Sequence, residues 1–252
     1  MPATLHWRTL GLVLALITLT VAVARADEAP VPMAEETFHH LLFENRYAAV
    51  YDVVLPPGAV MRFHRHPTNH LAVVVAGGTL RNEVVGAPVT ERSTGAGGTV
   101  VYLPAGPPHR QSNIGATPVH FVAAEVLAPA PAGKVVDATV KRAGCSVVQD
   151  NAVITAWLCR LAPGARLVAL PVGVPALRVA LGVGQVGLVD PHGAEVTTTL
   201  APGAVTWLDG DVRADVVNRG DVAVELVEVA WRPEAKPIPR TVDIPRNPGA
   251  TE

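Results

Sequence analysis

The chain has 252 residues, with 20 Lys and Arg against 22 Asp and Glu, and a formal net charge of −2. This near balance, without a basic cluster, argues against nucleic acid and anionic membranes as partners. The length suffices for one large domain or two of ordinary size, and the Val, Pro and Gly content with few charged runs predicts an all-β protein.

The first 26 residues have the pattern of a secretory signal peptide. Arg8 lies in a short basic end, and Ala24-Arg25-Ala26 forms a small-x-small cleavage site. An uncleaved membrane anchor is the alternative. However, the apolar run between them, 9–24, is shorter than the roughly 20 residues that span a bilayer. We predict cleavage after Ala26 and a soluble protein that is periplasmic or secreted.

Short apolar stretches punctuated by Gly and Pro follow a Pro- and Ala-rich lead-in. His39 and His40 stand just before the first stretch, and we interpret them as surface or strand-edge histidines. The stretches are 47–55, 60–66, 71–76, 79–85, 99–103 and 120–127. Such regular spacing is typical of a sandwich or barrel rather than of alternating βα units.

Four histidines occur at suggestive spacings in the first half. His64 and His66 are two residues apart, so on a strand both side chains point to one face. His70 follows a Pro-Thr-Asn turn, and His109 follows a turn of Pro, Ala and Gly. Two hairpin arms should therefore bring four imidazoles together, which is a transition-metal constellation.

The stretch from Gly58 to Asn113 resembles the two conserved motifs of the cupin superfamily, G(X)5HXH(X)3-4E(X)6G and G(X)5PXG(X)2H(X)3N. It matches nine of their ten fixed positions, and the exception is His70, which stands where the family usually has Glu. The resemblance implies a double-stranded β-helix, or jelly-roll, barrel with one divalent transition metal: Fe, Mn, Ni, Cu or Zn. The implied ligands are His64, His66, His70 and His109.

The pattern starts again after a Pro- and Ala-rich linker near 128–133. The sequence Leu55-Pro56-Pro57-Gly58 returns as Leu161-Ala162-Pro163-Gly164, and Asn113 returns as Asn218. The equivalents of the four histidines are Leu170, Val172, Ala176 and Ala214. None of these side chains can hold a metal.

We therefore expect two tandem cupin-type barrels, a bicupin, with a metal site at 38–128 and a degenerate copy at 140–232. A Pro-rich tail, 233–252, follows. The degenerate barrel should pack against the first and cover sheet edges, and an apolar ligand pocket in its interior is the alternative. Cys145 and Cys159, on its first two expected strands, form either a disulfide worth about 3 kcal/mol or two separate buried thiols.

Two side chains are predicted to contact a substrate. Arg62 should share the strand face of His64 and His66 and anchor a carboxylate or carbonyl, unless it extends to solvent or pairs with an acid. Gln111 should share the face of His109. Asn113, two residues further, is interpreted as a turn-holding residue.

Three function classes remain open. The favoured one is a metal-dependent oxidoreductase, an oxygenase acting on a small oxygenated organic acid or dicarbonyl compound. A non-oxidative lyase or isomerase is the second, although no inward-facing Tyr or Glu can be assigned as a general base. The third is a periplasmic small-molecule or metal-binding protein without turnover. A homo-oligomer is compatible with each class.

Overall fold

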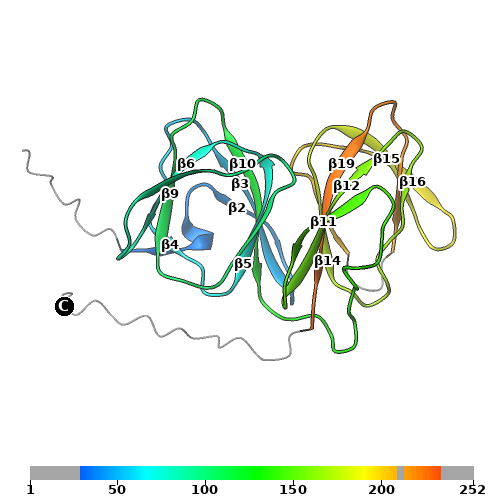
Figure 1. The fold of residues 1–252 in the computed structure, drawn as a ribbon, viewed down its shortest axis with the longest axis horizontal. Coiled ribbons are helices and arrows are strands. Elements are labelled where there is room, and N and C mark those ends of the chain that lie inside the picture. Colours follow the sequence, from blue (N-terminus) through cyan, green and yellow to red (C-terminus); the bar gives the residue numbers. More distant parts are fainter. Residues whose placement is uncertain (1–28, 209–212, 234–252) are drawn as a thin grey trace, which may run out of the picture.

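The computed structural model describes residues 29–208 and 213–233, which form two β-barrels side by side (Figure 1). The signal peptide predicted at 1–26 lies outside the described residues, as does the predicted tail beyond Pro233. Within the described ranges the only helical element is a 3-10 turn, η1 (Met33–Glu35). No helix in this part of the chain is long and apolar enough to cross a membrane.

The first barrel consists of two five-stranded sheets. Its strands are β1 (Val31–Pro32), β2 (His39–Glu44), β3 (Ala48–Leu55), β4 (His64–Arg65), β5 (His70–Ala76), β6 (Thr79–Val84), β7 (Thr90–Ser93), β8 (Val100–Leu103), β9 (His109–Asn113) and β10 (Val119–Val126). The order is β1-β4-β9-β6-β7 in one sheet and β2-β3-β10-β5-β8 in the other. From β3 onward the chain alternates between the two sheets except at the hairpin β6–β7, as in a jelly roll.

The second barrel repeats this arrangement. Its strands are β11 (Cys145–Asp150), β12 (Ile154–Leu161), β13 (Arg166–Leu167), β14 (Ala176–Ala180), β15 (Gly184–Val189), β16 (Glu195–Leu200), β17 (Val205–Leu208), β18 (Asp215–Asn218) and β19 (Val224–Trp231). The orders β11-β12-β19-β14-β17 and β13-β18-β15-β16 match those of the first barrel. The predicted all-β fold with two tandem jelly-roll barrels is confirmed, whereas the predicted domain bounds stay predictions.

One repeated turn explains why the sequence Leu-x-Pro-Gly occurs in both halves of the chain. The Ala59 amide donates to the Pro56 carbonyl at 3.1 Å, and Gly58 between them has a φ of 76°. Pro at the second position and Gly at the third, with positive φ, define a type II turn. Gly164 has the same φ of 76° in the second barrel. A side chain at either glycine would be strained.

An asparagine that occurs in both barrels holds the turn after β9. The side-chain amide of Asn113 donates to the carbonyl oxygens of Leu55 and Thr117, each at 2.8 Å, and its side-chain oxygen accepts from the Gly115 backbone amide at 2.9 Å. Asn218 makes the equivalent three contacts in the second barrel. The prediction that Asn113 holds a turn is therefore confirmed.

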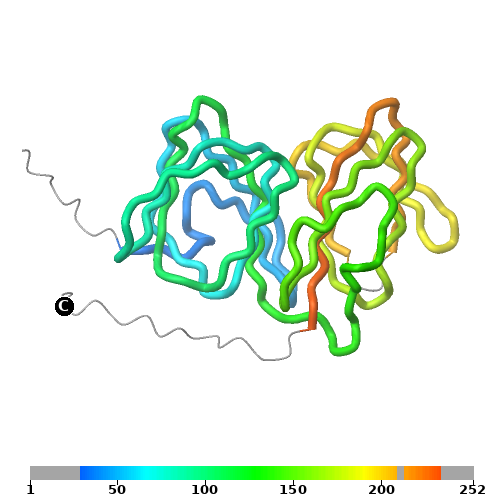
Figure 2. The backbone as a smooth tube through the Cα atoms, viewed as in Figure 1, coloured from blue at the N-terminus to red at the C-terminus, as the bar shows by residue number. Residues whose placement is uncertain are grey.

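The largest hydrophobic cluster joins the two barrels. It contains Leu71 and Val73 of β5 together with Leu177 and Val179 of β14, which occupy equivalent positions in the repeat. Separate clusters fill the interior of each barrel. The contact between the two barrels runs along these sheets (Figure 2). The expectation that the second barrel packs against the first is confirmed.

Two equivalent glycines permit the close approach of the barrels. A Cβ atom on Gly98 of the first barrel would lie 2.8 Å from Cδ1 of Leu158 in the second. A Cβ atom on Gly203 of the second barrel would collide with His120 of the first and lie 3.6 Å from Asp52. Asp52 and Leu158 are themselves equivalent in the repeat, so the interface is reciprocal, as in a twofold dimer.

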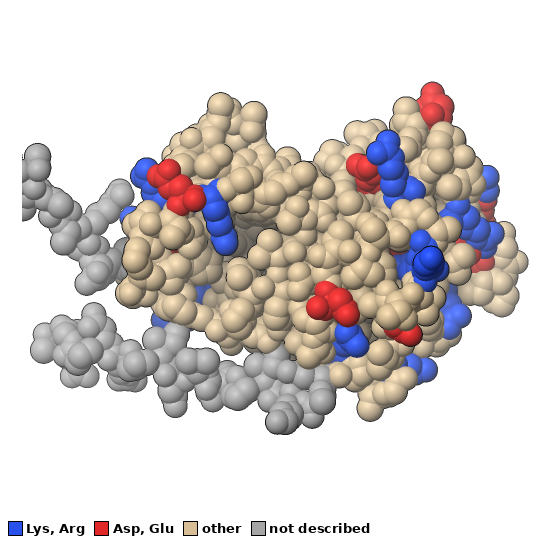
Figure 3. Space-filling view, in the orientation of Figure 1, with Lys and Arg blue, Asp and Glu red and all other residues tan. Residues whose placement is uncertain are grey.

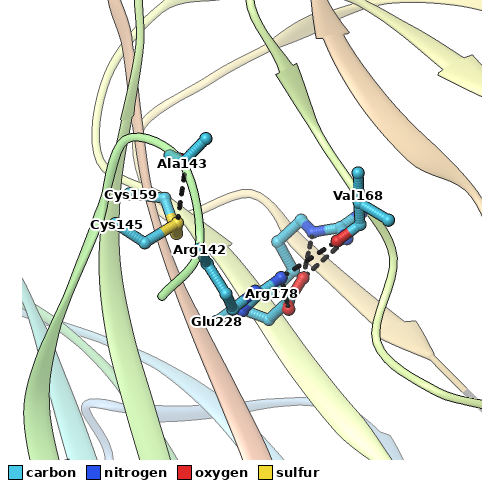
Figure 4. The surroundings of a disulfide bond; sticks show 7 residues. All are labelled: Arg142, Ala143, Cys145, Cys159, Val168, Arg178 and Glu228. Carbon is cyan, nitrogen blue, oxygen red and sulfur yellow. Dashed lines mark hydrogen bonds and ion pairs between the residues drawn. A yellow bond between two sulfur atoms is a disulfide. The ribbon is translucent and has the colours of Figure 1, made fainter. Parts of the chain in front are cut away.

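Cys145 and Cys159 form a disulfide bond in the second barrel (Figure 4). They are directly opposite each other on the neighbouring strands β11 and β12, with Cα atoms 4.0 Å apart. The alternative of two separate thiols is therefore excluded. The bond connects the outermost strand of its sheet, β11, to the strand beside it.

Candidate metal centre

Three of the predicted ligands, His64, His66 and His109, lie together inside the first barrel. His64 in β4 is directly opposite His109 in β9, and His66 follows β4 on the same face as His64. One potential ligand atom from each of the three lies within 4.8 Å of the others. In the described residues this is the one group of His, Cys, Asp or Glu compact enough to hold a metal ion.

His70, the first residue of β5, lies beside this group without belonging to it. Its ring stacks on the ring of His66, with centroids 3.6 Å apart and an interplanar angle of 10°. The Nδ1 atoms of both rings are buried and have no hydrogen-bond partner. Ligation by His70 stays a prediction, and so does the ligand role of the other three histidines.

All four imidazoles are held in the neutral form. Burial, reinforced by neighbouring imidazoles, lowers the pKa of His64, His70 and His109 to about 4. Burial and the rings of His70 and His109 also lower the pKa of His66. Since only a neutral imidazole can donate its lone pair to a metal, the side chains present fit a divalent transition metal.

A buried acid, Glu125, lies behind these rings. It ends the inward-facing series of β10, pairs across the strands with His70, and places Oε1 3.7 Å from His66 Nδ1. That oxygen has no hydrogen-bond partner. Burial, with the nearby Glu44 carboxylate, raises the pKa of Glu125 to about 7. Sequence reasoning missed this acid, although alternation along β10 points it inward with Phe121 and Ala123.

Glu36 and His39 form a second buried acid–imidazole pair. His39 Nδ1 lies 2.7 Å from Glu36 Oε2, and the two side chains are 5% and 0% exposed. Burial raises the pKa of Glu36, but hydrogen bonds from His39 and from backbone amides outweigh this and lower it. His39 begins the edge strand β2, which fits the predicted strand-edge position, but it is not a surface histidine, because it is buried and its ring lies 4.8 Å from that of His64. His40 is exposed, as predicted.

The histidines line a cavity of about 130 Å³ inside the barrel. Apolar side chains such as Val53 and Ala72 form much of its wall. A second hollow of about 350 Å³ lies beside it and shares His66, His70 and His109 with it. A small molecule can therefore reach the imidazoles through an apolar barrel.

Of the two predicted substrate contacts, one lines the hollows and the other does not. Gln111 lines both hollows, on the same face of β9 as His109. Arg62 is exposed while His64 is buried, because β4 begins only at His64 and the strand alternation assumed for Arg62 does not extend to it. The predicted shared face is therefore wrong for Arg62. Arg92, which the sequence did not single out, lines both hollows instead.

Comparison with known proteins places this geometry in a family. The family described as "Cupin domain" matches residues 51–125, which contain all four histidines and Glu125. The first barrel therefore contains a cupin domain. No curated protein is significantly similar to the chain.

Solved cupins share the two-barrel fold. AerE from Microcystis aeruginosa is 13% identical, with a TM-score of 0.55 over 80% of this chain and 97% of that one. The Mn(II)-containing oxalate decarboxylase of Bacillus subtilis is 14% identical, with a TM-score of 0.55 over 76% and 71%. A formate complex of Lactobacillus farciminis oxalate decarboxylase is 15% identical, with a TM-score of 0.53 over 75% and 78%. At these identities the likeness establishes the fold alone.

The second cupin barrel has charged groups where the first has its cavity. Arg178 and Glu228 pair across β14 and β19, at the positions of the cavity-lining Ala72 and Ala123. Both are buried, with the Arg178 Nη2 atom 2.6 Å from Glu228 Oε2. Arg142, from the segment just before β11, places Nη2 2.7 Å from Glu228 Oε1 (Figure 4). This cupin barrel is therefore filled at the place where the first is open.

Proposed function

We propose that the chain is a metal-dependent cupin oxidoreductase acting on a small oxygenated organic acid or dicarbonyl compound. The observation that carries the proposal is the group of three neutral, buried imidazoles, His64, His66 and His109, facing a cavity of about 130 Å³. Bound Fe, Mn, Ni or Cu would supply a Lewis acid with redox capacity and positions open to exogenous ligands.

The remaining side chains supply binding and orientation. Arg92 and Gln111 line both hollows, so they can contact a substrate carboxylate and its oxygen atoms. Apolar walls exclude water from the reacting part of the substrate, which strengthens these polar contacts. Glu125 is not among the cavity-lining residues and acts through His66, whose free Nδ1 faces its carboxyl group at 3.7 Å.

A second candidate is a non-oxidative lyase or isomerase that uses the same centre. One observation favours it: His39 lines the cavity with its Nδ1 atom held by Glu36, so the cavity contains an imidazole that can take up a proton. Sequence reasoning found no such group. Binding without turnover is the third outcome that the experiment below distinguishes.

We further propose that the protein is exported, by cleavage after Ala26, and that its partner is a small molecule rather than nucleic acid or membrane. The sequence pattern of residues 1–26 supports export. The disulfide between Cys145 and Cys159 supports an oxidising compartment. On the face in Figure 3 charged side chains of both signs lie interspersed, and few of them lie on the first barrel.

The test is metal analysis of the exported protein purified without chelators, followed by dioxygen uptake with a panel of small acids and β-dicarbonyls. We expect about one redox-active metal per chain and substrate-dependent uptake. His109→Ala should lose the metal, while the exposed control His40→Ala should keep it. Stoichiometric zinc without dioxygen uptake would overturn the oxidoreductase proposal. Product formation without dioxygen uptake would establish the second candidate.

A further inference from the structure

Both oxygen atoms of the Glu36 carboxylate accept hydrogen bonds. Its Oε1 atom accepts from the Arg62 amide at 3.1 Å, and its Oε2 atom accepts from the Phe38 amide at 2.8 Å. A backbone N–H can only donate, so both oxygens act as acceptors. Because the pKa of Glu36 is lowered, its carboxylate is ionised and can only accept, so the third contact, 2.7 Å from Oε2 to His39 Nδ1, places a proton on Nδ1.

This hydrogen bond fixes the character of the other ring nitrogen. A neutral imidazole with its proton on Nδ1 has a bare lone pair on Nε2 and can only accept there. His39 lines the cavity together with Val53, its partner on the neighbouring strand β3. Its ring centroid lies 4.8 Å from that of His64 and 6.3 Å from that of His66. The ring therefore faces the space next to the three-imidazole group without being part of it.

We propose that Glu36 and His39 form a specificity-determining pair in which His39 Nε2 accepts a hydrogen bond from a hydroxyl group of the substrate. The inference rests on the proposed metal-dependent function and names its substrate class: a small hydroxy acid, or an acid in its enol form, with a proton to donate. A fully ionised dicarboxylate has no such proton. Its approach would leave the buried Nε2 lone pair unpaired, which a site built to accept a hydrogen bond penalises.

The tautomer can be tested without metal. In the full chain labelled with ¹⁵N-histidine, two-bond ¹H–¹⁵N correlations distinguish a protonated Nδ1 from a protonated Nε2, and His39→Gln identifies the signal. We expect the His39 proton to lie on Nδ1. Glu36→Gln removes the charged acceptor and should yield a mixture of tautomers. A proton on Nε2 in the wild-type chain would overturn the inference, whatever the metal chemistry proves to be.

The specificity can be tested with two acids that differ by one methyl group, and with oxalate as a third probe. Glycolate has a hydroxyl group, whereas methoxyacetate has a methyl ether at the same position. Titration of the metal-loaded full chain should give glycolate an affinity about 10-fold higher than that of methoxyacetate, with oxalate also disfavoured. In His39→Phe the affinity for glycolate should fall about 10-fold and the preference should vanish. In His39→Gln, which retains an acceptor oxygen, part of the preference should return.

Each remaining outcome has one interpretation. If His39→Phe loses the metal, His39 is a ligand and the specificity role is wrong. If the metal stays and the preference for glycolate is unchanged, the hydrogen bond to the substrate is also wrong. If the metal-loaded wild type binds all three probes equally, or none, the substrate class is overturned. The proposed function fails separately, when the wild-type chain holds no metal or converts no acid.

Discussion

The two barrels have the same strand order, yet their interiors are opposites. At one cross-strand pair the first barrel has Ala72 and Ala123 around its cavity, and the second has the buried ion pair Arg178–Glu228. At another pair the first has His39 opposite Val53, and the second has the Cys145–Cys159 disulfide. The first barrel keeps space and unpaired polar atoms for a ligand. The second has an ion pair and a disulfide at the equivalent positions.

The comparison explains how one fold supports two roles. Small side chains on β5 and β10 leave room for a substrate, while large side chains on β14 and β19 remove it. The buried charges of the second barrel are tolerated because Glu228 contacts two guanidinium groups, from Arg142 and Arg178. The candidate metal centre therefore lies in the barrel whose interior is open at this position.

The largest predicted difference between the two barrels is the effect of low pH on stability. The folded first barrel holds His64, His70 and His109 with pKa values of about 4, below the ordinary value of 6.5. Between pH 6.5 and pH 4 the unfolded chain binds more protons, so these groups contribute stability that is complete above pH 6.5 and declines as the pH falls toward 4. Glu125, with its pKa raised to about 7, acts in the opposite direction between pH 7 and 4.5 and offsets part of the loss.

We expect the metal-free protein to lose more than about 3 kcal/mol of unfolding free energy between pH 7 and pH 4.5. Urea unfolding at a series of pH values measures this loss. A double variant with both His64→Ala and His70→Ala should show a shallower decline, whereas His40→Ala should follow the wild type. A pH-independent unfolding free energy would show that these imidazoles are not held neutral by the fold.

Removal of the central acid of the second barrel should give the next largest effect. Glu228→Ala leaves two guanidinium groups buried without their counter-ion, which costs about 3 to 5 kcal/mol of unfolding free energy. Glu225→Ala is the matched control, since Glu225 lies on the same strand and pairs with Arg160 at an exposed site. The control should cost less than about 1 kcal/mol. Equal losses in the two variants would show that the buried pair has no special role.

The disulfide should contribute somewhat less. Replacing Cys145 and Cys159 by Ala opens a loop closed by a sequence separation of 14, for which the entropy model gives about 3 kcal/mol. Thermal or urea unfolding of the double variant measures the loss. Metal content should remain that of the wild type, because the bond lies in the barrel that lacks the four predicted metal ligands. Loss of metal from this variant would contradict the division of roles between the barrels.

The smallest predicted effect concerns the acid behind the imidazoles. In Glu125→Gln the carboxylate that can accept a hydrogen bond from His66 Nδ1 is lost, and metal affinity should fall about 10- to 100-fold. Competition with a chelator of known affinity measures it. Glu44→Gln is the control, because Glu44 is an exposed acid near Glu125. Equal affinity in Glu125→Gln and the wild type would remove Glu125 from the site.

Local patterns in the sequence predicted the features that depend on local geometry. The type II turn at Gly58, the hydrogen-bonding of Asn113, the repeat and the inward histidines all follow from residue type and strand alternation. Arg62 failed because the same alternation was extended beyond the start of β4. The lesson is that period-two reasoning is valid only within a strand whose ends are known.

The features missed by sequence reasoning depend on contacts between distant residues. The buried Glu36 carboxylate accepts from the Arg62 amide, 26 residues later, and also contacts His39 of the cavity wall. Glu125 was a partial exception. Its inward direction follows from the alternation along β10, but an acid among apolar residues was not expected to point inward. The Arg178–Glu228 pair spans 50 residues. No local pattern reports such a pair.

Gly98 packs on Leu158, and the equivalent Gly203 packs on Asp52. The two barrels of the chain therefore pack against each other as the subunits of a dimer do. In a dimer of separate subunits, dilution exposes the shared apolar face, and stability depends on protein concentration. Here the linker near 128–133 keeps the two faces at a high effective concentration. Such a protein can be released into a dilute environment without losing its partner. One half can then lose its ligands while the other keeps the surface on which it packs.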